Sequence, residues 1–401
     1  MELFLQFGHN MRPLVFDLLS RWEQGTVILS PRDQTIERML RTKDEVTALN
    51  GSVVVDPQFY IPLADHIGLT SHTFWPTNKK NETAFFSQEE IKKMIILLRD
   101  DYHVPLDCKF FIIPGMYTSL INDDWYNVNS EVLECVKEEM GASENYLTVS
   151  ISSDILLSEE SIFLLIEYLD TFDVDGIYLV PEAPANSYLV ENPDWLVNLL
   201  DLCAAIKLQS KKLIVGYANH QLLTLALAKV DAIAAGNWLN VRSFNPEKFK
   251  ATEPGGGRRS MWYYCPQALT EYQVTYLDIA KRIGLLKQLQ TDRKYLSPKS
   301  ELLFTGAQPS SVNYRERDSF DHYLQCLKVQ CENSDKESYD ETFTALNVQF
   351  NTARIFADTM QKRRIIGKDR AIINVVEDTI TSISIFNELR GLSLSEQWNQ
   401  I

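Results

Sequence analysis

Two carboxylates stand where apolar runs of the sequence end. Asp56 directly follows the run 52–55, and Glu182 follows the run 176–180 after one proline. A carboxylate beside apolar walls is an expensive buried charge unless it has a partner. Such groups suit general acid, general base or nucleophilic roles, so we expect both to be catalytic. Asp154 is a third catalytic candidate, although it could instead cap a nearby helix.

Polar side chains also follow the other apolar runs of the first 250 residues. If those runs end at one place, their polar side chains form one site. We expect the following set to bind substrate: Gln58, His9, Asn219, His220, Asn237, Asn240 and Arg242. Equivalent positions hold Gln6, Asn10, Arg32, Asp33 and Ser152. Because a buried carboxylate persists only with a partner, Arg242 is expected to pair with Asp56.

Histidines and cysteines give only weak indications of a metal. His9 and His220, with Asp56 or Glu182, could supply nitrogen and oxygen ligands. Metal-dependent barrel hydrolases, however, place two histidines one residue apart on their first strand, and His9 stands alone. The six cysteines contain no CxxC pair, which favours reduced, buried thiols. We therefore expect no metal and no other cofactor.

A basic loop follows these runs. Residues 255–257 are three glycines, and Arg258 and Arg259 come next, beside the aromatic run 262–264. The loop could cradle a phosphate through its backbone amides, and the aromatic side chains could stack on a base. A hinge is the alternative interpretation. We predict that the two arginines bind an anionic ligand or an acidic partner surface.

Positioning these side chains requires a particular architecture. Eight apolar runs alternate with helical periodicity over residues 1–249 and lack polar alternation, as parallel strands covered on both faces do. This predicts a closed (β/α)₈ barrel, whose active site lies where the strands end. An open doubly wound sheet is the alternative, but its glycine-rich first turn is missing. The expected strands are 3–7, 26–29, 52–55, 109–113, 146–151, 176–180, 212–215 and 231–235, and the expected helices are 12–22, 35–49, 87–101, 129–140, 158–172, 194–210 and 221–229.

Two further features complete the expected organisation. Long connections over 60–86 and 116–128 follow strands, and the first could act as a lid or pack its own aromatic side chains. Residues 250–401 form an α-helical extension, which could contact a protein partner. Its expected helices are 267–290, 318–331, 339–361 and 369–389.

The segment 211–244 resembles the last βαβ unit of the tRNA-guanine transglycosylases, because Gly216, Val230, Asp231 and Arg242 keep the order of that family's motif. The run 56–59, Asp-Pro-Gln-Phe, is similar to the family's Asp-Ser-Gly-Gly-Phe-Gln. The resemblance implies a TIM barrel that acts on a base or nucleoside. Ala234 stands at the place of the family's nucleophilic aspartate, and the family's cysteine-rich zinc cluster is missing.

Composition limits the partners and the setting. Residues 1–249 hold 19 Lys and Arg against 35 Asp and Glu, so nucleic acid is not expected on the acidic barrel surface. Residues 250–401 hold 20 Lys and Arg against 19 Asp and Glu, so binding of nucleic acid to this part of the chain stays possible. No run of about 18 apolar residues occurs, and no basic leader precedes the first apolar run. We expect a cytoplasmic protein with no membrane partner.

Two hypotheses about function follow. The first is a transglycosylase-like enzyme acting on a base, a nucleoside or a substrate derived from nucleic acid, with Asp56 contacting the base and Glu182 or Asp154 as nucleophile or general base. The second is a barrel without chemistry that serves as a binding or scaffold subunit of a larger complex. Ala234 and the missing zinc cluster favour the second hypothesis.

Overall fold

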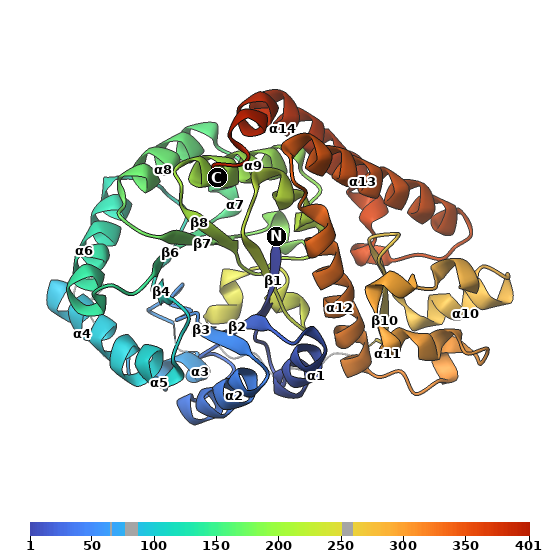
Figure 1. Ribbon diagram of the computed structural model, residues 1–401, viewed down its shortest axis with the longest axis horizontal. Coiled ribbons are helices and arrows are strands. Elements are labelled where there is room, and N and C mark those ends of the chain that lie inside the picture. Colours follow the sequence, from blue (N-terminus) through green and yellow to red (C-terminus); the bar gives the residue numbers. More distant parts are fainter. Residues whose placement is uncertain (65, 77–86, 251–259) are drawn as a thin grey trace.

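The computed structural model describes residues 1–64, 66–76, 87–250 and 260–401. Its parallel strands follow the order β3-β2-β1-β9-β8-β7-β6-β4. The backbone N–H of Lys109, just before β4, donates to the carbonyl of Val53 in β3 at 2.9 Å, which nearly closes the sheet. The strands are β1 (Glu2–Gln6), β2 (Gly25–Leu29), β3 (Gly51–Val55), β4 (Phe111–Ile113), β5 (Tyr117–Thr118), β6 (Asn145–Ile151), β7 (Gly176–Pro181), β8 (Lys212–Val215) and β9 (Ala232–Ala235). The predicted TIM-barrel-like fold is confirmed (Figure 1).

Helices alternate with these strands and cover the barrel. They are α1 (Arg12–Trp22), α2 (Ile36–Ala48), α4 (Gln88–Leu98), α6 (Asp123–Met140), α8 (Glu159–Thr171), α9 (Pro193–Leu208) and the 3₁₀ helix His220–Ala228, with short helices α3 (Ile67–Thr70), α5 (Val104–Leu106) and α7 (Ser153–Leu156) between them. The side chains of Ser87, Asn122, Ser158 and Asn192 cap four of the helices by accepting a backbone N–H. Because Asn122 caps α6, this helix begins six residues before the predicted start at 129.

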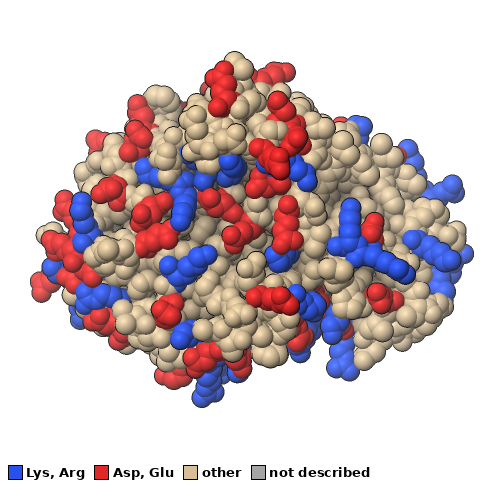
Figure 2. Space-filling model, in the orientation of Figure 1, with Lys and Arg blue, Asp and Glu red and all other residues tan. Residues whose placement is uncertain are grey.

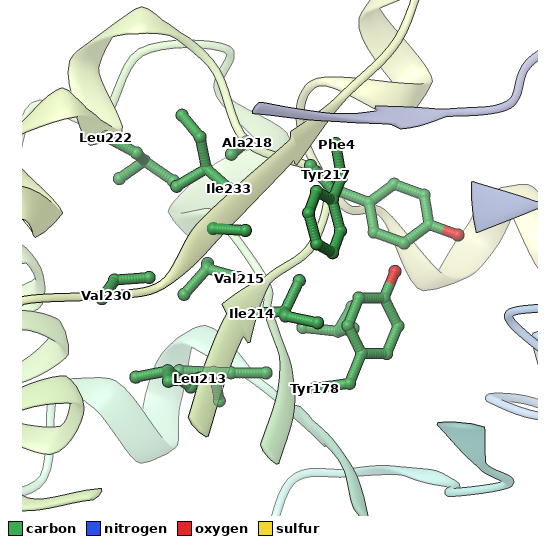
Figure 3. Packing of buried hydrophobic residues seen from close by; sticks show 14 of the residues in the cluster. Phe4, Tyr178, Leu213, Ile214, Val215, Tyr217, Ala218, Leu222, Val230 and Ile233 are labelled. Carbon is green, nitrogen blue, oxygen red and sulfur yellow. The ribbon is translucent and has the colours of Figure 1, made fainter. Parts of the chain in front are cut away.

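Strand register decides which side chains fill the barrel. Tyr178 of β7 is in register with Thr148 of β6 and Ile214 of β8. Partners in register point to the same face, and neighbours along a strand point to opposite faces. Figure 3 shows Tyr178, Ile214 and Phe4 on one side of β8, and Val215 and Leu222 on the other. Tyr178 reaches across the barrel to Gln6 of β1, so its face is the interior.

A bulge interrupts the barrel wall where β4 ends. Ile113 is paired with Leu147 of β6, and Tyr117 of β5 is paired with Ser150. Residues 114–116 therefore oppose only residues 148–149, which is the pattern of a β-bulge.

Gly115 lets the bulge lie against β6. A Cβ atom there would stand 2.4 Å from the carbonyl oxygen of Thr148 and 2.8 Å from its Cβ. We expect Gly115→Ala to lower the free energy of unfolding by about 1–3 kcal/mol, because backbone atoms must separate to admit the methyl group. Urea unfolding measures this loss. The exposed Ser119→Ala serves as control, and equal stability of the two variants would contradict the close approach.

The C-terminal part corrects one prediction. The segment 267–290 is not a single helix, because β10 (Trp262–Cys265) and β11 (Thr270–Gln273) form an antiparallel hairpin before α10 (Val274–Arg282) begins. The extension is therefore not purely α-helical. Tyr263, Tyr264 and Tyr272 explain the hairpin, since aromatic residues favour strands whenever they pack against a core.

Three long helices end the chain: α12 (Glu316–Ser334), α13 (Tyr339–Lys362) and α14 (Val376–Gln397). The helix α12 packs against α1, β1 and the 3₁₀ helix His220–Ala228, where the eighth helix of a barrel belongs (Figure 1). Its buried side chains share the main hydrophobic core with the strands, whereas the hairpin and α10 build a second core. The boundary predicted at residue 250 stays a prediction.

The surface reflects the uneven charge of the sequence. On the face shown in Figure 2, acidic side chains are spread over the barrel, and Lys and Arg predominate over the part that contains α10. Within the described parts of the chain, no helix combines the length and the apolar character needed to cross a bilayer.

Candidate functional site

Asp56 lies at the carboxyl end of β3, inside the barrel, with 1% of its surface exposed. Three phenol hydroxyls donate to its Oδ2 atom: Tyr60 at 2.7 Å, Tyr217 at 3.2 Å and Tyr178 at 3.3 Å. The backbone N–H of Gln58 donates to Oδ1 at 2.8 Å. Among the described residues, neutral hydrogen-bond donors rather than a cation hold this carboxylate.

This environment changes the acidity of Asp56. Burial raises its pKa to about 6, although the hydrogen bonds from Tyr60 and from the backbone of Gln58 act in the opposite direction. Burial dominates because no positive charge among the causes that act on Asp56 within the described residues replaces the lost hydration. A carboxyl group with a pKa near neutrality can both accept and release a proton under physiological conditions.

Gln58 connects Asp56 to the loop after β2. Its side-chain Oε1 accepts from the hydroxyl of Ser30 and from the backbone N–H of Arg32, both at 2.9 Å. Its Nε2 donates to the hydroxyl of Tyr217 at 3.2 Å. Gln58 therefore joins the loops after β2, β3 and β8 around one carboxylate.

Unpaired polar atoms surround the same region. Gln6 Nε2, Thr148 Oγ1 and Ser150 Oγ are buried and have no hydrogen-bond partner among the described residues. Gln6 is fully buried, and its Oε1 lies 3.0 Å from the Tyr178 hydroxyl oxygen, whose one proton it shares with Asp56. Buried polar groups are normally paired, so these three atoms mark a place where further hydrogen bonds can form.

Aromatic rings close the end of the barrel over Asp56. The rings of Phe244 and Phe249 each lie 4.9 Å from the ring of Tyr60, and both side chains are 1% exposed. The Arg32 guanidinium covers the Phe249 ring at 4.7 Å. The segment 244–249 thus covers Asp56, whereas the sequence analysis gave a lid as one of two interpretations of the loop 60–86.

The described part of that loop packs onto the scaffold. His72 lies within 2.9 Å of the Pro31 carbonyl and 2.8 Å of the Tyr102 hydroxyl. Phe74 and Trp75 are buried beside it. Residues 65 and 77–86 of the loop lie outside the described part of the chain.

Glu182 belongs to a second group at the same end of the barrel. Its Oε2 accepts from the Tyr117 hydroxyl at 2.6 Å and from the backbone N–H of Ser153 at 3.2 Å. Burial and the hydrogen bond to Glu182 raise the pKa of Tyr117. The Phe244 ring lies between the two groups, 6.1 Å from the Tyr117 ring and 4.9 Å from that of Tyr60. Asp154 is exposed in the first turn of α7.

Arg242 does not pair with Asp56, and that prediction is wrong. The guanidinium is 2% exposed, lies 3.5 Å from Glu271 of β11, and covers the Tyr323 ring at 3.5 Å. Its Nε donates to the Gly236 carbonyl at 2.7 Å. The chain turns through a 3₁₀ helix, Leu239–Val241, just before Arg242, which directs this residue towards the hairpin instead of the barrel interior.

The remaining predicted binding residues lie elsewhere. Asn219 caps the 3₁₀ helix by accepting from the Gln221 N–H and donates to the Tyr188 carbonyl, and His220 is fully buried beside Tyr323. Asn237 donates to the carbonyl of the exposed His9 at 2.9 Å. Asn240 is half-buried, and Arg258 and Arg259 lie outside the described residues. Of the predicted binding residues, the structure places Gln58 beside Asp56, whereas Asn237 contacts His9 and Asn219 contacts the carbonyl of Arg242 away from that carboxylate.

Tyr60, Tyr178 and Tyr217 are the residues that sequence reasoning missed. Each looked like an ordinary core residue, because nothing in an apolar run shows where a phenol oxygen will point. A weak signal existed in Tyr178, the aromatic residue within the run 176–180 that ends at Glu182. Figure 3 shows the Tyr178 and Tyr217 rings on the same side of β8.

No group of three or more His, Cys, Asp or Glu side chains within the described ranges is arranged to hold a metal ion. The comparisons with known proteins add no relative: no protein-family model matches the chain, and no curated protein matches it either.

Proposed function

We propose that the carboxyl end of the barrel binds a planar nitrogen heterocycle, such as a nucleobase, through Asp56. The observation that carries the proposal is a fully buried carboxylate that is held by phenols and an amide and enclosed by aromatic rings. It lies at the end of the barrel where active sites of this fold are found. Such a carboxylate forms its strongest interactions with a ligand that donates hydrogen bonds to it.

The donors and acceptors around Asp56 suit a heterocycle. Oδ1 accepts one described hydrogen bond, from Gln58, and so has a lone pair for a ring N–H. Gln6 Nε2, Thr148 Oγ1 and Ser150 Oγ supply partners for exocyclic groups. The ring of Tyr60 becomes available to stack on a flat ligand once the segment 244–249, with Phe244 and Phe249, moves aside. The resemblance to the transglycosylases supports a base as the heterocycle.

Chemistry on this ligand is the first of two candidate functions. Asp56 would exchange a proton with a ring nitrogen, since its pKa of about 6 suits general acid and base catalysis near neutral pH. Glu182 would serve as nucleophile or general base from the far side of Phe244. This arrangement describes a transglycosylase-like enzyme.

A binding subunit without chemistry is the second candidate, and two observations favour it. Ala234, at the position of the family's nucleophilic aspartate, is in register with the interior residue Phe4 and offers no reactive group. Phe244 separates Asp56 from Glu182 in the closed barrel. Under this candidate, the heterocycle acts as a signal or structural ligand rather than a substrate.

Equilibrium dialysis with radiolabelled guanine, adenine and uracil tests the binding proposal. We expect at least one base to bind and Asp56→Asn to weaken that binding at least tenfold, because a hydrogen bond to a charged group contributes about 1.5–3 kcal/mol. The control is Asp154→Asn, which removes an exposed carboxylate from the same end of the barrel. Absence of binding to all three bases, or equal binding by Asp56→Asn, would refute the proposal.

Incorporation of the labelled base into tRNA or DNA separates the two candidates. The enzyme hypothesis predicts incorporation that Glu182→Gln and Asp56→Asn each abolish. Binding in dialysis without incorporation identifies the chain as a binding subunit.

A further inference from the structure

A cavity of about 940 Å³ lies in the wall of the barrel, outside the site around Asp56. The chain after β3, residues 59–63, forms one side, and the bulge after β4, residues 114–118, forms another. Helices α4 and α6 pack against each other and close the outer side (Figure 1). The volume lies in the range of small-molecule pockets.

The local fold creates this cavity. The bulge moves β5 to follow β6, while the chain after β3 continues towards Tyr60. The backbone N–H of Tyr117 donates to the Tyr60 carbonyl at 2.9 Å, which fixes the two sides relative to each other. The space between them is therefore a preformed part of the barrel rather than a surface irregularity.

The lining defines the chemistry of a ligand. The walls are largely apolar or aromatic, with Phe59, Ile91, Met94, Met116, Trp125 and Val132 among them. Among the described residues that line the cavity, the charged ones are Asp124 and Glu131, both exposed, and none is a Lys, Arg or His. Apolar walls exclude a strongly hydrated ligand, and the carboxylates repel an anion.

We propose that this cavity binds an amphipathic organic cation, an aromatic or alkyl body that carries an amine. The body occupies the apolar part between α4 and α6, and the ammonium group lies towards Asp124 and Glu131. The aromatic rings of Tyr117 and Trp125 add the attraction that a ring face exerts on a cation.

The cavity and the barrel interior share two walls. Tyr60 and Tyr117 line the cavity, and their hydroxyls donate to Asp56 and Glu182 respectively. A ligand in the cavity therefore lies beside the two residues whose hydroxyls hold the carboxylates. The inference nevertheless stands apart from the proposed function, because the cavity would bind its ligand even if Asp56 bound none.

Three fluorescent probes that share the dansyl group but differ in charge test this proposal: monodansylcadaverine (cation), dansylamide (neutral) and dansylglycine (anion). We expect monodansylcadaverine to bind with enhanced emission and about three- to tenfold more tightly than dansylglycine at low salt, with dansylamide between them. The preference for the cation should shrink as salt rises, because both carboxylates are exposed.

Substitutions in the lining test whether the probes bind in the cavity and whether Asp124 and Glu131 cause the preference for the cation. Val128→Trp fills the cavity from a half-buried position, so it should reduce binding of all three probes at least tenfold while the fold is preserved. Asp124→Asn with Glu131→Gln should remove the preference for the cation and leave dansylamide binding unchanged. As control, Phe163→Ala removes an exposed aromatic side chain of α8 that does not line the cavity.

Two results would overturn the proposal: equal affinity for the cationic and anionic probes, or unchanged probe binding in a folded Val128→Trp protein. Val132→Phe, also in the lining, repeats the test if Val128→Trp fails to fold. Asp56→Asn should leave probe affinity within about twofold of the parent. Loss of nucleobase binding without loss of probe binding would thus affect the proposed function alone.

Discussion

Glu271→Gln is expected to lower the free energy of unfolding by about 3–5 kcal/mol, the largest effect of any single substitution considered for this chain. Glu271 is 3% exposed, and its carboxylate lies 3.0 Å from Arg370 and 3.5 Å from Arg242. Tyr188 donates to it at 2.8 Å. Glutamine keeps the shape of the side chain but removes the charge, so Arg242, itself 2% exposed, is left buried without compensation.

The position of this group explains why the effect should be large. Glu271 belongs to β11, Arg242 follows β9 of the barrel, and Tyr323, under the Arg242 guanidinium, belongs to α12. The three side chains join the hairpin, the barrel and its eighth helix. Arg370 is partly exposed and can turn towards water, whereas Arg242 is enclosed.

Urea unfolding of the parent and three variants measures this effect. The matched control is Glu138→Gln, which breaks an exposed pair with Lys92 and should change stability by less than about 1 kcal/mol. Arg242→Met combined with Glu271→Leu should recover part of the loss, because apolar side chains of similar size can replace a buried pair. If Glu271→Gln and Glu138→Gln lose equal stability, the buried group contributes nothing specific.

The pH dependence of the same group can be worked out from its pKa. Burial alone would raise the pKa of Glu271, but Arg370 and Arg242 hold it below its usual value. A lowered pKa in the folded state means that the stabilisation is present above the pKa of the unfolded chain. It is lost as the pH falls through the folded value, so Glu271 contributes to unfolding in acid.

The second large effect concerns Asp56 and has the opposite sign. We expect the difference in unfolding free energy between Asp56→Asn and the parent to shift by about 2.5 kcal/mol in favour of the variant between pH 4 and pH 8. Burial raises the pKa of Asp56 from 3.8 to about 6. The folded protein therefore binds the proton more tightly, and the stability that this gives below about pH 4 is lost as the pH rises through 6.

Thermal or urea unfolding at pH 4, 5, 6, 7 and 8 provides the measurement. At each pH, the free energy of unfolding of the parent is subtracted from that of the variant. This subtraction removes the contributions of all groups that titrate alike in both proteins. Asp154→Asn, which removes an exposed carboxylate from the same end of the barrel, is the control. A constant difference between Asp56→Asn and the parent would mean that Asp56 does not titrate over this range.

The barrel could be predicted from the pattern of apolar residues. Eight apolar runs at helix-separated spacing satisfy their backbone and bury both faces as parallel strands covered by helices, and each predicted run overlaps an observed strand. The sequence also singled out Asp56, because a carboxylate that directly follows Val53–Val55 must enter the core with them. These are local properties, fixed by periodicity and by the order of residues along one strand.

The side chains that surround this carboxylate could not be predicted, because they come from distant parts of the chain. Tyr178 and Tyr217 reach Asp56 from strands on the other side of the barrel, and their hydroxyls are separated from it by more than 120 positions along the chain. Arg242 lies with Glu271 of the hairpin, an element that the sequence analysis mistook for part of a helix. Partner choice depends on strand register, ring direction and the path of a short turn, and none of these is encoded in the local pattern of apolar and polar residues.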